Sequence, residues 1–203
     1  MRKQALCFAV IISIVHIAVI GTRASAATTG TATLSTDVQQ YIALTITAGS
    51  SVEFGNLTPA SPITAPVGGT VASVATSASN GYTLSLSDGS GTNSAMVHTD
   101  TTTYIADYAG TITTPTTWTG TGVGISLFAA DTTKEAKWGT GTTYNDANNK
   151  YAGVPANATV AHTVATYSEG ADTSTWAFKV DVLNSQKTGT YSGDVTFTAT
   201  ASL

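Results

Sequence analysis

The stretch Trp176-Ala177-Phe178-Lys179-Val180-Asp181-Val182 sets the fold class of this chain. Its large apolar residues recur at every second position, which is the period of a β-strand with one face turned toward a core. Three further stretches alternate in the same way: residues 41–47, 82–87 and 191–200. No stretch has a convincing helical period, and the alternating positions are dominated by residue types that favour strands, such as Thr, Val, Ile, Tyr and Phe. The sequence therefore predicts an all-β protein.

Short segments rich in Gly, Pro and Asn separate these strands. They are residues 59–66, 80–81, 88–91, 139–141 and 188–189. Such residues favour turns because they accept the backbone angles that a tight reversal requires. Many short strands joined by turns of this kind predict an antiparallel β-sandwich with Ig-like or Greek-key connections.

The middle of the chain, residues 90–151, is less regular. Residues 111–122 are rich in Thr, Gly and Pro, so we expect a long exposed loop there. Residues 131–137 are compatible with one helical turn capped by Asp131. The chain has no internal repeat, and we expect residues 27–203 to form a single β-sandwich domain.

The N-terminus has the pattern of an export signal. Arg2 and Lys3 form a basic start, residues 5–20 are apolar, and Ala24-Ser25-Ala26 is a small-x-small cleavage motif. We expect residues 1–26 to be a signal peptide and the protein to be secreted or displayed at the cell surface. The alternative is that the apolar run stays as a membrane anchor, since about 20 residues cross a bilayer. After cleavage we expect no membrane span.

The composition after signal removal argues against several partners. Arg2, Lys3 and Arg23 leave with the signal, so five lysines face 12 acidic residues and the net charge is −7. Nucleic acid binding depends on clustered Lys and Arg, so we expect no nucleic acid partner. The one cysteine, Cys7, also leaves. The fold must therefore be stabilised without a disulfide, although export would permit one.

Three segments together resemble a known group of proteins. Residues 52–59 (VEFGNLTP) resemble an opening V-x-F-G-x-L-x-P motif, residues 76–86 (TSASNGYTLSL) a second core strand, and residues 188–198 (TGTYSGDVTFT) a closing strand. The group consists of exported bacterial β-sandwich surface proteins, including WxL-like cell-wall proteins, spore-coat-U-like proteins and fimbrial subunits. The resemblance implies an exported sandwich. None of the three tryptophans begins the Trp-x-Leu motif of a wall-binding WxL domain.

The sequence offers little catalytic chemistry. The histidines His98 and His162 are far apart in sequence, and there is no His-Glu-x-x-His motif, no Gly-x-Ser-x-Gly motif and no cysteine nucleophile after the signal. We therefore predict a protein that is not an enzyme and has no cofactor. A secreted glycoside hydrolase is the remaining enzymatic alternative. Its carboxylates would come from Glu53, Glu135, Glu169 or an aspartate.

Two turn segments carry oxygen ligands of the kind that calcium binds, residues 88–91 and 145–149. Aspartate and asparagine are also the usual residues of turns, because they tolerate left-handed backbone and bond their own chain. We favour a turn role for both segments and predict no metal site.

The aromatic residues provide the candidate ligand site. Trp118 and Trp138 lie in polar, Gly-rich surroundings, where an exposed ring can stack on a sugar or a partner protein. For Trp138 the alternative is that it covers one end of the sandwich. Trp176 alternates in step with Phe178 and Val180, which places it in the core.

These observations favour a non-catalytic structural or adhesion protein of the cell surface, with self-association into a filament as one form. A carbohydrate-binding or host-surface-binding module is the alternative, with glycans or other surface proteins as partners. Residues 27–36 are polar and then alternate. They are predicted either to pair within their own domain or to add as a strand to another copy.

Overall fold

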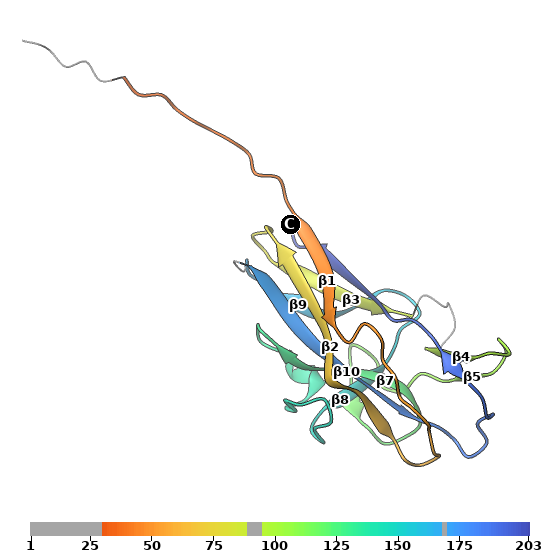
Figure 1. Ribbon diagram of the computed structural model, residues 1–203. Coiled ribbons are helices and arrows are strands. Elements are labelled where there is room, and N and C mark those ends of the chain that lie inside the picture. Colours follow the sequence, from red (N-terminus) through yellow and green to blue (C-terminus); the bar gives the residue numbers. More distant parts are fainter. Residues whose placement is uncertain (1–29, 89–94, 168–169) are drawn as a thin grey trace, which may run out of the picture. The chain divides into compact units, whose positions relative to one another are not determined.

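The computed structural model describes residues 30–88, 95–167 and 170–203. It divides into two units, Met1–Val38 and Gln39–Leu203. The predicted signal peptide, residues 1–26, lies outside the described residues. In the first unit, residues 30–38 are described; none of them is in a strand and all are exposed. The second unit is a β-sandwich (Figure 1).

The elements of the second unit are almost all strands. They are β1 (Ile42–Ala48), β2 (Ile63–Thr76), β3 (Tyr82–Ser87), β4 (Met96–His98), β5 (Tyr104–Ile105), β6 (Thr116–Thr117), β7 (Gly122–Ala130), β8 (Lys150–Gly153), β9 (Thr159–Val164), β10 (Ala171–Asp181), β11 (Tyr191–Ser192) and β12 (Thr196–Ala201), with one 3-10 helix, η1 (Ala136–Trp138).

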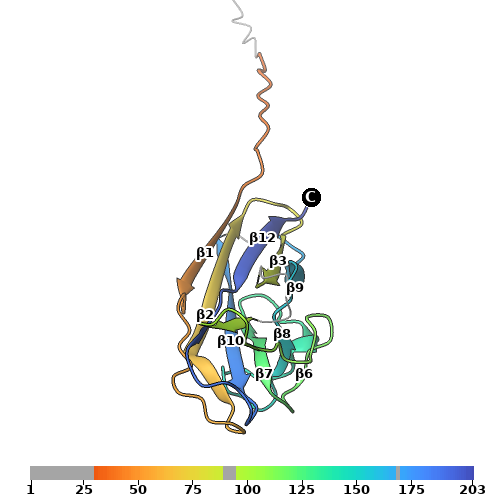
Figure 2. The same ribbon diagram turned by 90° about the vertical axis from the view of Figure 1, so that its right-hand side faces the viewer.

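Two antiparallel sheets form the sandwich. The larger has six strands in the order β1-β2-β10-β7-β8-β6, and the smaller has three in the order β12-β3-β9. A further three-stranded sheet has the order β11-β4-β5, and Figure 1 shows β4 and β5 at the right-hand side of the view. Figure 2 shows β12, β3 and β9 beside β1, β2 and β10. The predicted fold class, an all-β sandwich, is confirmed.

The core lies between the two sheets, and the predicted inward rows form it. Leu84 and Leu86 of β3 are fully buried, as are Trp176 and Val180 of β10. The rows of β1 and β12 also face inward, but they are only half-buried at the margin of the core. The period-two alternation of the sequence therefore identified the correct faces of these strands.

Two long strands of the larger sheet, β2 and β7, escaped the sequence prediction. β7 lies between β10 and β8 and its first seven residues are all buried. A strand covered on both faces has no alternation to detect. β2 begins at Ile63, inside the segment predicted to be a turn. Its ladder with β10 is interrupted between Ala65 and Thr70, where Gly68 and Gly69 adopt positive φ.

The irregular middle differs in detail from the prediction. Ile112 is buried and β6 pairs with β8, so residues 111–122 are not simply an exposed loop. The predicted helical turn exists but begins later, with Glu135 at its N-cap and no side-chain cap. Asp131 instead accepts hydrogen bonds from the backbone N–H and the hydroxyl of Thr173, at 2.9 and 2.7 Å, and so ties the end of β7 to β10.

Candidate functional site

Trp138 is a core residue and not a ligand-binding aromatic. Its side chain is 0% exposed, its indole N–H donates to the Ala161 carbonyl at 3.0 Å, and its ring meets Trp176 edge to face with centroids 5.6 Å apart. Its Gly-rich surroundings misled the prediction, because Gly139 serves the backbone, with φ of 82° after η1. Trp138 is therefore part of the buried core cluster.

Trp118 is partly exposed and belongs to an aromatic cluster on the outer face of the larger sheet. Tyr108 stacks on its ring with centroids 4.3 Å apart and planes 13° apart, and Tyr151 meets it edge-on at 5.4 Å. The Lys179 ammonium lies 5.4 Å from the centroid of Trp118 and 5.3 Å from that of Tyr151. Protein groups thus already occupy positions over the ring, and stacking of a ligand on an open face is not the arrangement found.

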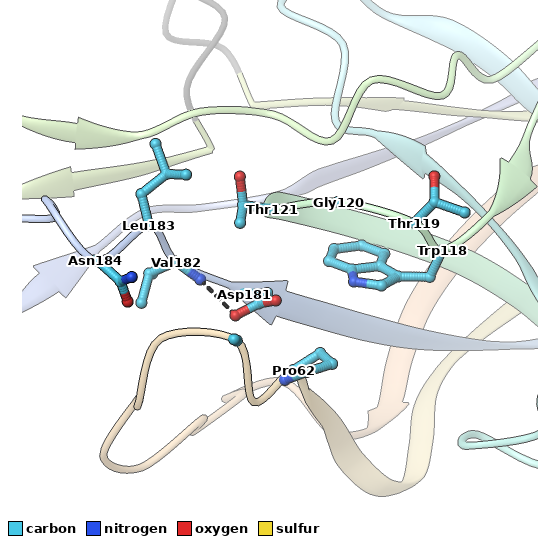
Figure 3. Close-up of a pocket in the computed structure, with 10 residues that line it drawn as sticks. Pro62, Trp118, Thr119, Gly120, Thr121, Asp181, Val182, Leu183 and Asn184 are labelled. Atoms are coloured by element: carbon cyan, nitrogen blue, oxygen red, sulfur yellow. Dashed lines mark hydrogen bonds between the residues drawn. The ribbon is translucent and has the colours of Figure 1, made fainter.

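A hollow of about 390 Å³ lies next to Trp118. It is lined by residues 118–121, residues 181–184, Ala60 and Pro62 (Figure 3). The strand register brings these parts together. Asp181 at the end of β10 pairs with Gly122 at the start of β7, so the loop entering β7 lies beside the chain leaving β10.

Two polar groups stand out in this hollow. Asp181 is only 7% exposed, and its Oδ1 accepts the backbone N–H of Val182 at 2.9 Å. The indole nitrogen of Trp118 is buried and has no hydrogen-bond partner among the described residues. Figure 3 shows the nitrogen side of the indole turned toward Asp181 and Pro62. Buried donors are normally paired, so this N–H marks a place where an acceptor would be favourable.

The two histidines among the described residues, His98 and His162, have structural contacts. His162 is fully buried, and its Nδ1 lies 2.8 Å from Glu135, whose other oxygen accepts the Thr163 N–H at 2.8 Å. His98 Nδ1 accepts the Asp100 N–H at 3.0 Å, and its Nε2 lies 3.3 Å from the Thr188 carbonyl. Neither histidine lines the hollow beside Trp118.

The candidate carboxylates are not gathered into a pair by any contact found. Glu135 is bound to His162, whereas Glu53 is exposed and accepts a hydrogen bond from Ser51. Glu169 lies outside the described residues.

The predicted calcium-type turn at residues 145–149 is described in full. Asp146 accepts backbone N–H groups from Thr142 and Asn148 at 3.3 and 2.9 Å, which is a turn role. Most of the turn at residues 88–91 lies outside the described residues. Across residues 30–88, 95–167 and 170–203, no group of three or more His, Cys, Asp or Glu side chains gathers to hold a metal ion.

The second candidate site is the side of the sandwich where β1 and β12 meet, which we call the open side. These strands belong to different sheets and contact each other. Each is paired on one edge, β1 with β2 and β12 with β3. Their inward residues are only partly buried: Ile42, Leu44 and Ile46 of β1, and Phe197 and Ala199 of β12.

The strands on the open side carry neither charged residues nor proline, although the β1 ladder has a register shift between Ile46 and Ala48. Natural edge strands are commonly blocked by charged residues or proline. β1 reads IALTITA and β12 reads TFTATA, without either. In the described part of the chain, β1 has a ladder with β2 alone and β12 with β3 alone, so one edge of each strand has no ladder partner.

Residues 30–38, the N-terminal segment, match this edge in pattern. Ala32, Leu34 and Val38 occupy even positions, in phase with Ile42 and Leu44 of β1. Leu34 is 94% exposed and Val38 is 85% exposed. The prediction that this segment is an edge strand of its own domain is wrong for residues 30–36, since none of them is in a strand.

No protein-family model, curated protein or solved structure matches this chain. Among the described residues, no helix is long and apolar enough to cross a membrane.

Proposed function

We propose that this chain is a non-catalytic protein of the cell surface or extracellular space whose copies join by strand addition. The N-terminal segment of one copy pairs with the free edge of β1 in the next and lays its apolar row over the open side. One observation carries the proposal: an exposed, unpaired segment continues the alternation of a strand whose own edge is free.

Export is the first support for this function. The signal pattern of residues 1–26 is typical of exported chains and supports a location outside the cytoplasm, and the resemblance to exported surface proteins and fimbrial subunits supports the same location. Strand addition to a sheet edge is a general mode of recognition, in which main-chain hydrogen bonds provide affinity and alternate side chains provide specificity.

The sequence between the segment and β1 favours another copy over the segment's own β1. To pair with β1 of the same chain, residues 30–38 would have to reverse through Gln39, Gln40 and Tyr41. Tight hairpins favour residues that adopt positive φ, such as Gly or Asn, and none of these three residues has that preference. A second copy's edge imposes no such turn.

The segment has the length and the apolar content that the edge requires. Residues 30–38 extend about 30 Å at roughly 3.3 Å per residue, enough to span the seven residues of β1. Burial of Leu34 and Val38 contributes about 1.5–3 kcal/mol each, and each ladder bond adds about 0.5–1.5 kcal/mol. Association costs about 4–15 kcal/mol, so the ladder and the apolar row are both needed.

The direct test compares the secreted chain, its start checked by intact mass, with a chain that begins at Gln39. The full chain is expected to form oligomers or fibres by light scattering and negative-stain microscopy, and the shortened chain to be a folded monomer. A synthetic peptide of residues 30–41 should then bind the shortened chain and raise its melting temperature. Identical oligomers from both chains, or monomers from both, would contradict the proposal.

A matched pair of variants separates strand pairing from charge. Leu34→Asp with Val38→Asp places two charges on the inward row, whereas Thr33→Asp with Ser35→Asp places two on the outward row. The first pair should abolish assembly and the second should leave it intact. Equal loss in both would mean that added charge, and not the strand face, controls association.

A further inference from the structure

We infer that the hollow beside Trp118 is a binding site for a hydroxyl-rich neutral ligand, that is, a carbohydrate. The inference rests on the polar groups that line the hollow and is independent of assembly at the open side. Three features carry it: a buried indole N–H without a partner, a nearly buried carboxylate on the same hollow, and a rim without a cation.

Trp118 and Asp181 together favour a ligand group that can both accept and donate a hydrogen bond. The indole N–H can only donate a hydrogen bond, and the ionised carboxylate can only accept. A hydroxyl group does both, because it accepts from Trp118 through a lone pair and donates its proton to Asp181. An ammonium group cannot accept from the indole, and a ligand carboxylate or phosphate would be repelled by Asp181.

The charges around the hollow do not favour an anionic ligand. Among the residues that the structure describes, no lysine or histidine lines the hollow. The nearest basic side chain on β10, Lys179, is directed over the rings of Trp118 and Tyr151. Burial lowers the pKa of its ammonium, although Tyr108 and Asp181 oppose that effect. Nothing in the hollow therefore compensates an anion, which leaves neutral polar ligands.

The volume and the lining of the hollow suit a sugar. A volume of about 390 Å³ is within the range of roughly 300–1,000 Å³ that small-molecule sites occupy. Pro62 and Val182 provide apolar walls, and Thr119, Thr121 and Asn184 provide polar groups at the rim (Figure 3). A sugar presents apolar C–H faces and a ring of hydroxyls, which is the combination that this lining accommodates.

The three indole N–H groups provide a direct readout. Those of Trp138 and Trp176 donate to Ala161 and Ser174, whereas that of Trp118 is unpaired. The ¹⁵N-labelled mature chain, either wild type or the Leu34→Asp, Val38→Asp form if wild type assembles, is titrated with D-glucose, N-acetyl-D-glucosamine, D-galactose and D-mannose. At least one sugar should shift the Trp118 indole signal, which Trp118→Phe assigns by removing it, and leave the other two unchanged.

Variants and control ligands decide among the outcomes. Asp181→Asn should weaken the binding sugar about tenfold or more, since hydrogen bonds to a charged group are the stronger ones, while the remaining amide spectrum reports that the fold is intact. Thr173→Ser, remote from the hollow, should leave affinity unchanged. A response to glycerol equal to that of every sugar, a response to methylammonium instead, equal shifts of all three indoles, or no shift with any of the four sugars would overturn the inference.

Discussion

At the scale of single residues, Trp138 and Trp176 form an edge-to-face contact within the core. Both side chains are 0% exposed, and each indole N–H has an acceptor. Replacing Trp138 with Ala should lower the free energy of unfolding by about 3–5 kcal/mol, as for other buried Trp→Ala changes. Chemical denaturation measures this, with the exposed Tyr167→Ala as control. Similar losses in both variants would show that Trp138 is not a core residue.

Glu135 gives the molecule an acid-sensitive contact. Its burial opposes ionisation, but hydrogen bonds from His162 and the Thr163 backbone outweigh that effect and lower its pKa. An ionised Glu135 therefore stabilises the fold at neutral pH, and this stabilisation is lost as pH falls through the lowered pKa. Thermal unfolding between pH 7 and pH 3 should show a smaller acid loss for Glu135→Gln than for wild type. An unchanged pH profile would contradict the assignment.

Asp107 should act with the opposite sign. Burial and the negative charge of Asp88 raise its pKa to about 6, against the backbone N–H groups of Ala95 and Val154. Between the unfolded pKa of 3.8 and about 6 the folded state holds the extra proton, so stability rises as pH falls through this window. Asp107→Asn should therefore be more stable than wild type at pH 7, with the advantage gone at pH 4. If Asp107→Asn were less stable than wild type at pH 7, the raised pKa assigned to Asp107 would be wrong.

At the scale of elements, β12 tests the strand register. Phe197 faces inward and meets Trp176 edge to face at 5.8 Å, whereas Thr198 is exposed. Because Phe197 is only half-buried, Phe197→Ala should cost somewhat less than the roughly 3–5 kcal/mol of a fully buried Phe. Thr198→Ala should change the melting temperature little. Equal effects on thermal unfolding would mean that the two faces are exchanged.

The elements also explain which parts of the fold the sequence could predict. Alternation reveals a strand when one face is buried and the other is exposed, as in Tyr82–Ser87. It fails for Gly122–Ala130, which is buried on both faces. It also says nothing of which strands are neighbours, so the edges on the open side became identifiable only with the sheet order.

The candidate site shows the same limit. Trp118 was recognisable from its polar surroundings, but Asp181 was not, because their proximity depends on the β10–β7 register that pairs Asp181 with Gly122. Trp138 has surroundings of the same kind in sequence and is buried. Local composition therefore does not distinguish a surface tryptophan from one that a loop places in the core.

At the scale of the whole molecule, residues 27–203 combine few positive charges with the absence of any cysteine. Most of the five lysines in this range have contacts or lie in a strand. Lys134 donates to the Gly141 carbonyl at 2.5 Å, Lys137 and Lys179 lie over aromatic rings, and Lys150 is in β8. Lys187 pairs with Asp100 at 2.7 Å, and its side chain is 54% exposed. It lies in the loop between β10 and β11.

The positions of the lysines determine where trypsin can cleave the protein. Trypsin cuts after lysine and arginine and needs an accessible, irregular segment, and Lys187 is the described residue that best meets both needs. A brief digestion should nick the chain between Lys187 and Thr188 before any other site, as mass spectrometry would show. The cleavage would break the covalent link between the fragment that carries β11 and β12 and the chain before it. The ladders of β11 with β4 and of β12 with β3 would still hold this fragment in place. The cleaved protein should therefore keep its elution volume in size-exclusion chromatography under native conditions and separate into two fragments only after denaturation. Scarcity of cleavable bonds would give the proposed extracellular protein resistance to proteolysis without a cross-link.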